Sequence, residues 1–94
     1  MRDWLRSLNK KVKTGIGANI LRVQWRWPVS RPLVGSFGRG LYEVRTSLDG
    51  NIYRVFFCIM YGTMVLLHGF AKKTEATPAK ELEIARERQQ EVRA

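Results

Sequence analysis

The chain has 94 residues, a single cysteine and a net charge of +9 from 17 basic and 8 acidic side chains. This length predicts one domain, residues 1–94, and the apolar fraction of 45% excludes a disordered chain. One cysteine forms no intrachain disulfide, and the longest apolar run, residues 55–67, falls short of the roughly 18 residues of a membrane span. We therefore expect a soluble, cytoplasmic protein with no membrane partner.

The positive charge is concentrated in the first half of the chain. Residues 1–45 hold ten basic and two acidic side chains, whereas residues 46–94 hold seven and six. Such an excess favours a polyanion or an acidic protein as the partner, and nucleic acid is the commonest polyanion. The alternative is a basic surface that is merely solvated.

Two helices are expected first, at about residues 2–12 and 14–25, because apolar residues recur there at helical spacing. Two prolines, Pro28 and Pro32, then predict an ordered loop over residues 27–40. We interpret Trp25 and Trp27 as packing anchors rather than as platforms for stacked bases.

Three strands are expected next, at about residues 41–48, 51–60 and 63–70, where the apolar pattern alternates. Asp49-Gly50 is a strong signal for a two-residue hairpin turn, and Tyr61-Gly62 predicts a second turn. Three consecutive strands joined by tight turns make an antiparallel meander.

A last helix is expected at about residues 78–92, with Thr77 as its N-cap and Pro78 at its first position. Its apolar stripe is thin, so we expect this helix to be the most mobile or partner-dependent element. The order of elements predicts an α+β fold: a small twisted antiparallel sheet, two amino-terminal helices packed on it, a carboxyl-terminal helix, and the helices covering one face.

The Asp49-Gly50 turn places Arg45 opposite Arg54 on one face of the sheet. Like charges in directly opposite positions destabilise a sheet, so something should compensate them. Glu43, two positions along on the same face, could neutralise one arginine. The functional alternative is an anion such as a phosphate, held by both guanidiniums.

The end of the third strand is expected to come close to this pair. With Tyr61-Gly62 as the turn, Gly69 pairs with Arg54, leaves room for a ligand backbone, and brings Phe70, Lys72 and Lys73 within reach. The same register places His68 on the opposite face, as a hydrogen-bonded core histidine or, alternatively, a catalytic base.

Several kinds of site are missing from the sequence. It contains no Cys/His spacing typical of a metal site, no phosphate-binding GxxxxGK loop, no GxGxxG and no GxSxG. The acidic residues are too few and too scattered for a two-carboxylate or two-metal site. We therefore expect no cofactor and no metal.

Several segments together resemble the RelE/ParE toxin superfamily, and within it the HigB-like, phage-derived branch. These are LYEVR (residues 41–45), IYRV (52–55), VLLHGFAKKT (65–74), RDWLRSL (2–8) and the helix that starts at Thr77-Pro78. Two features depart from the pattern. Glu43 replaces a residue that is basic in some relatives. Relatives usually carry a strand before the RDWL segment, whereas here Met1 directly precedes Arg2, so either the chain starts late or this strand is missing, and the sheet is expected to have one strand fewer.

The resemblance implies a RelE-like fold and a toxin of a toxin–antitoxin module. Its activity would be metal-independent, ribosome-dependent cleavage of mRNA, which blocks translation. Its partners would be mRNA, the ribosome and a helix-turn-helix, HigA-like antitoxin, and it would contact operator DNA only through the antitoxin. A ParE-like inhibitor of DNA gyrase and a non-catalytic basic binding module are the alternatives.

Site residues follow from the resemblance by position. The catalytic residues would be Arg45, Arg54, Lys72 and Lys73, with His68 and Tyr53 as further candidates for the general base. The RNA-binding residues would be Arg39, Arg45, Arg54, Phe70, Lys72 and Lys73.

Overall fold

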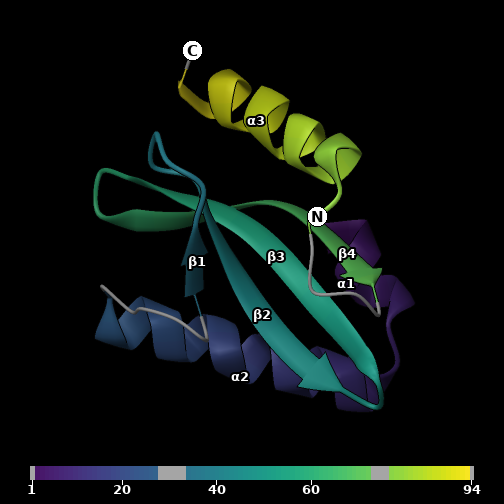
Figure 1. Ribbon diagram of the computed structural model, residues 1–94. Coiled ribbons are helices and arrows are strands. Elements are labelled where there is room, and N and C mark those ends of the chain that lie inside the picture. Colours follow the sequence, from purple (N-terminus) through teal and green to yellow (C-terminus); the bar gives the residue numbers. More distant parts are fainter. Residues whose placement is uncertain (1, 28–33, 73–76, 94) are drawn as a thin grey trace.

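A computed structural model describes residues 2–27, 34–72 and 77–93, which contain three helices and four strands (Figure 1). In chain order these are α1 (Arg2–Ser7), α2 (Lys10–Arg26), β1 (Val34–Ser36), β2 (Tyr42–Leu48), β3 (Asn51–Met60), β4 (Thr63–Lys72) and α3 (Ala79–Arg93). The strands form one antiparallel sheet in the order β1-β2-β3-β4. The α+β class is therefore confirmed. Within the described ranges, every helix is too short or too polar to cross a membrane.

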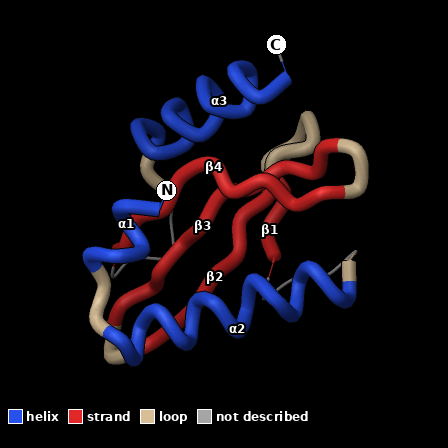
Figure 2. The backbone as a smooth tube through the Cα atoms, turned by 180° about the vertical axis from the view of Figure 1, so that it is seen from behind, coloured by secondary structure: helices blue, strands red, loops and turns tan. Residues whose placement is uncertain are grey.

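The sheet separates two layers of helix (Figure 2). On one face, partly buried residues of α1 and buried residues of α2 pack on alternate residues of the central strands. The third helix, α3, covers the opposite face, where Ala85 packs in one cluster with Phe56 and Cys58. The expectation that all helices cover one face is therefore wrong. The four consecutive β3 residues 55–58 are at most 1% exposed, and a strand buried on both sides needs a cover on both. This burial also raises the pKa of the Cys58 thiol.

The boundary between the first two helices lies nearer the amino terminus than the expected position at residues 12–14. The first helix ends at Ser7, and Asn9 caps α2 by accepting a hydrogen bond from the Val12 backbone N–H at 2.9 Å. Asn is among the preferred N-cap residues because its side chain satisfies a backbone donor that the helix leaves open. The two glycines of α2, Gly15 and Gly17, lie inside the helix rather than at its start.

An edge strand replaces part of the loop expected over residues 27–40. Val34–Ser36 pairs with β2, so that Val34 lies opposite Val44 and Gly35 opposite Glu43. A three-residue strand carries too little alternation to be recognised in a sequence. The guanidinium of Arg45 lies over Gly35, where an added Cβ would come within 3.2 Å of Nη2. The part of the expected loop that contains Pro28 and Pro32 lies outside the described residues.

Two tight turns set the register of the meander. Asp49 and Gly50 both have positive φ, 52° and 79°, as a type I′ turn requires, and Arg45 pairs with Arg54 as predicted. Tyr61 and Gly62 have φ of 50° and 77°. The β3–β4 pairing, however, shifts by one residue between Phe56 and Phe57. A β-bulge of this kind changes which side chains share a face beyond it.

Candidate functional site

A buried carboxylate lies between the two facing arginines. Arg45 Nε donates to Glu43 Oε1 at 2.7 Å, and Arg54 Nη1 lies 3.5 Å from the same oxygen. The side chains of Glu43 and Arg54 are fully buried, whereas that of Arg45 is 31% exposed. Glu43 therefore compensates the like charges, which is the first of the two alternatives that the sequence left open. Of the three side chains, Arg45 is the one that reaches solvent.

Thr77 joins this group from the segment that leads into α3. Its hydroxyl accepts from Arg54 Nη1 at 2.7 Å and donates to Glu43 Oε2 at 2.9 Å. The prediction that Thr77 is the N-cap of α3 is wrong. The carbonyl of Pro78 accepts the first helical N–H groups, those of Glu81 and Leu82, so Pro78 occupies that position. We call Glu43, Arg45, Arg54 and Thr77 the Glu43 cluster.

The stability of the Glu43 cluster depends on each of its members, because its charges are buried. Moving charges out of water costs several kcal/mol per ion, roughly, and only good geometry with further hydrogen bonds offsets that cost. Here two cations share one carboxylate, and a hydroxyl satisfies its second oxygen. The buried carboxylate of the cluster therefore holds the Arg45 guanidinium in place, while part of that guanidinium stays in solvent.

His68 lies on the same face as Arg54, not on the opposite one. The bulge places it opposite Phe56 and shifts Gly69 from Arg54 to Val55. His68 Nε2 lies 2.6 Å from Glu81 Oε2, and Arg88 Nη1 lies 3.3 Å from Nδ1. A guanidinium can only donate, so Nδ1 accepts and Nε2–H donates to Glu81. With both ring nitrogens engaged by α3, His68 has the environment of a structural histidine.

The space above Gly69 is filled by the protein itself. A Cβ at this position would lie 2.5 Å from the ring of Trp4, so the missing side chain admits α1 and not a ligand backbone. Tyr53 faces the same helical layer, packed beside Val12 and Ile16. Tyr53 is therefore separated by the sheet from the Glu43 cluster.

The remaining predicted residues fall into different environments. Phe70 is 7% exposed and packs 5.9 Å from Phe56, ring centroid to ring centroid, which is a core position. The exposed Arg39 lies in a turn with φ of 55°, and its carbonyl accepts hydrogen bonds from Gln89 and Arg93 of α3. Lys72 ends β4 opposite Ile52, and Lys73 lies outside the described residues.

The sequence signalled Arg45, Arg54 and Glu43 but not the fourth member of the cluster. Thr77 lies 23 positions after Arg54, and no local pattern connects a residue before a helix to a distant strand. Among the described residues, no group of three or more His, Cys, Asp or Glu side chains is arranged to hold a metal ion. What the site presents to solvent is a cation: the partly exposed guanidinium of Arg45, held by the buried carboxylate of Glu43.

The model of the family described as phage-derived Gp49-like proteins (DUF891) matches residues 3–90. Neither the curated proteins nor the solved structures give a match.

Proposed function

The chain belongs to the phage-derived Gp49-like family, a family of RelE-like toxins, and we propose that it is a HigB-like toxin that cleaves mRNA on the ribosome. A toxin of this family has an antitoxin as its partner, and we propose that this antitoxin is a HigA-like, helix-turn-helix protein. The observation that carries the proposal is the family match, because it spans residues 3–90 and so includes every element that builds the Glu43 cluster.

Cleavage of RNA without a metal needs cations at the phosphate. The 2′-OH loses its proton to a base and attacks the adjacent phosphorus, and the P–O5′ bond breaks as the 5′ oxygen takes a proton, which leaves a 2′,3′-cyclic phosphate and a 5′-OH. Negative charge develops on the non-bridging oxygens on the way, and preorganised donors that meet this charge lower the barrier. Arg45 suits this role because Glu43 takes its Nε–H and the rest of a partly exposed guanidinium can face a phosphate. Lys72, which ends β4, and Lys73, which follows it in the sequence, would add positive charge.

Arg54 receives a different role from that of a phosphate clamp. Its side chain is fully buried and bonded to Glu43 and Thr77, so it acts through the carboxylate that orients Arg45. We regard Glu43 and Arg54 as positioning residues. The environments of His68 and Tyr53 favour neither as the general base.

The test is to express the chain in a bacterial host and to map the 5′ ends of cellular mRNA. We expect new ends within coding sequences and growth arrest, and we expect Arg45→Ala to reduce cleavage about a hundredfold to a thousandfold. Lys11→Ala is the matched control, because it removes an exposed basic side chain that pairs with Asp49 on the hairpin turn. It should cleave like the wild type.

Two outcomes would contradict the proposal. Full cleavage by a folded Arg45→Ala variant would show that the Glu43 cluster is not the site. Growth arrest with DNA damage and intact mRNA would indicate a gyrase-directed toxin instead.

A further inference from the structure

The outer face of α2 carries apolar side chains that the fold does not use. Val12, Ile16 and Val23 form the buried stripe, at most 2% exposed. At about 100° per residue, Leu21 and Trp25 project from the opposite side of the helix. They are 55% and 84% exposed, so Trp25 is not the packing anchor that the sequence predicted, whereas Trp27 packs edge-on against Tyr42 and Phe57. A surface helix with an apolar group on its solvent side points to a partner.

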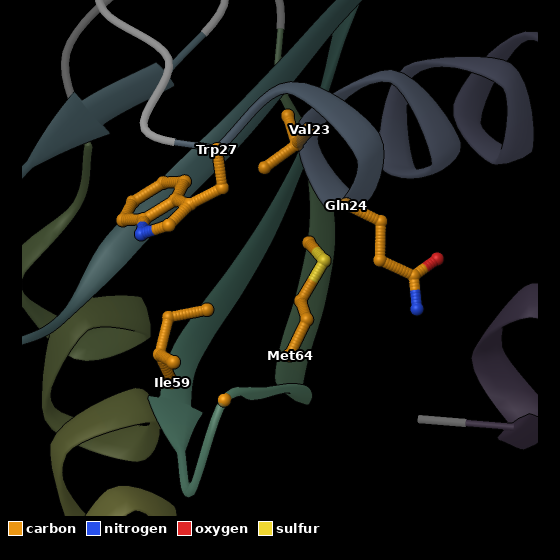
Figure 3. A pocket seen from close by; sticks show the side chains of 6 residues that line it. Val23, Gln24, Trp27, Ile59 and Met64 are labelled. Carbon is orange, nitrogen blue, oxygen red and sulfur yellow. The ribbon is translucent and has the colours of Figure 1, made fainter.

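A hollow lies at the carboxyl end of α2 (Figure 3). It has a volume of about 110 Å³ and lies between the last turns of the helix and the β3–β4 turn. Its lining is mostly apolar: Val23, Trp27, Ile59 and Met64, with Gln24 and Gly62. An apolar cavity of about 150 Å³ can bind benzene, so this hollow would admit one aliphatic side chain of a partner.

The hollow and the exposed residues form one continuous surface. Gln24 lines the hollow and also borders a second depression with Leu21 and Trp25. The neighbouring turn presents Tyr61, which is fully exposed and has φ of 50°. A bulky residue in this left-handed conformation is uncommon and costs about 1–2 kcal/mol at an ordinary position. We call Leu21, Gln24, Trp25, Tyr61 and the hollow the α2 patch.

The charge around the α2 patch selects the kind of partner. Arg22 and Arg26 are exposed and adjacent to Leu21 and Trp25, and α2 carries five basic residues and no acidic one. A second copy of the chain would bring the same arginines face to face, on a protein with a net charge of +9. An acidic segment with aliphatic side chains would instead satisfy both the charge and the apolar surface.

We propose that the α2 patch is the docking site of the antitoxin, through an acidic amphipathic segment that inserts an aliphatic side chain into the hollow. This rests on the proposed function only in requiring a cognate antitoxin, not in requiring mRNA cleavage. The patch lies on the α2 side of the sheet and the Glu43 cluster on the α3 side, so changes in the patch should leave toxicity intact.

The test measures binding of the purified cognate antitoxin to the purified chain by calorimetry. Trp25→Glu should weaken binding at least about thirtyfold, as loss of a buried aromatic anchor does. Thr14→Glu is the matched control, since it adds the same charge to an exposed position of the same helix, about three turns away. It should bind within about twofold of the wild type. Both variants should keep the circular dichroism spectrum and unfolding midpoint of the wild type.

The acidic character of the partner has its own measurement. Arg22→Glu should slow association and flatten the dependence of affinity on salt concentration, because an attraction between opposite charges has become a repulsion. Unchanged or tighter binding by Arg22→Glu would overturn the inference that the docking segment of the antitoxin is acidic. In cells, Trp25→Glu should arrest growth and resist neutralisation by the antitoxin, whereas Thr14→Glu should be neutralised.

Other occupants would each give a distinct result and overturn the proposal. If the wild type self-associates and Trp25→Glu is monomeric with unchanged antitoxin affinity, the patch is a homodimer contact. If Trp25→Glu loses affinity for a single-stranded oligoribonucleotide and binds the antitoxin normally, the patch stacks bases. Absence of any complex between the wild type and the antitoxin also overturns it. If Trp25→Glu fails to bind but the wild type leaves mRNA intact, the docking site stands and the proposed mRNA cleavage fails.

Discussion

The two faces of the sheet are covered by helices in different ways. On the α2 face the contacts are mainly apolar, with Val12, Ile16 and Val55 buried in one cluster, and the α2 side chain of Asn19 donates to the Thr46 hydroxyl at 2.8 Å. On the α3 face, by contrast, polar groups are buried with the apolar ones: Glu43, Arg54 and Gln89 are at most 3% exposed. Non-directional burial therefore dominates on the α2 face, whereas the α3 face combines apolar burial with many directional bonds.

The hydrogen bonds of α3 attach this helix to the sheet and to the loop before β2, where its thin apolar stripe offers little contact. Arg86 donates to the carbonyls of Phe37 and Gly38, Arg88 to that of Leu67, and Gln89 and Arg93 to that of Arg39. Long polar side chains thus hold the helix against carbonyls of the loop before β2 and of β4. Because each such bond contributes only about 1 kcal/mol net, α3 depends on many small contributions, whereas α2 depends on a few large ones.

The largest effect on this comparison should come from Glu43→Ala. The change removes the buried carboxylate that Arg45 and Arg54 share, and breaking a buried ion pair costs about 3–5 kcal/mol of unfolding free energy. Urea denaturation measures it. Lys11→Ala breaks the exposed pair with Asp49, whose side chains are more than half exposed, and should cost no more than about 1 kcal/mol. Equal losses in the two variants would mean that the Glu43 cluster contributes no more than a surface ion pair.

A smaller effect is expected on the α2 face from Gly69→Ala. The new methyl group would lie 2.5 Å from the Trp4 ring, and overpacking of this kind costs about 1–3 kcal/mol. Gly17→Ala is the matched control, because nothing lies within 4 Å of its Cβ position and alanine favours a helix by about 1 kcal/mol over glycine. Thermal unfolding should therefore shift in opposite directions for the two variants. A stabilised Gly69→Ala variant would contradict the close packing of α1 on the sheet.

The features predicted correctly from the sequence are those set by neighbouring residues. Asp49-Gly50 adopts the turn that its chemistry favours, and the pairing of Arg45 with Arg54 follows by counting from it. Glu43 was recognised as one possible compensation for the arginines because strand alternation places it on their face. The sequence could not decide between this carboxylate and an external anion, since burial of the cluster depends on α3 and Thr77.

The errors arose where distant segments meet. The bulge at Phe56 and Phe57 has no glycine or proline to signal it, and it moved His68 to the other face and Gly69 by one position. The short β1 strand has too few residues for a pattern. The uninterrupted apolar run of residues 55–58, typical of a strand covered on both faces, is the signal in the sequence that α3 lies opposite α2.

The smallest expected effect, from Arg86→Ala, tests how α3 is held. Arg86 donates to the Phe37 and Gly38 carbonyls at 2.5 and 3.1 Å, and its loss should cost about 1 kcal/mol. If α3 opens locally before the sheet does, amide hydrogen exchange should quicken about fivefold in α3 and stay unchanged in β3. Gln90→Ala changes an exposed α3 residue and should leave exchange as it is in the wild type. Unchanged exchange in Arg86→Ala would mean that the apolar contacts of Leu82 and Ala85 are enough to hold α3 on the sheet. Equal acceleration in α3 and β3 would mean that both faces unfold as one unit, and the difference between them would then be one of chemistry and not of local stability.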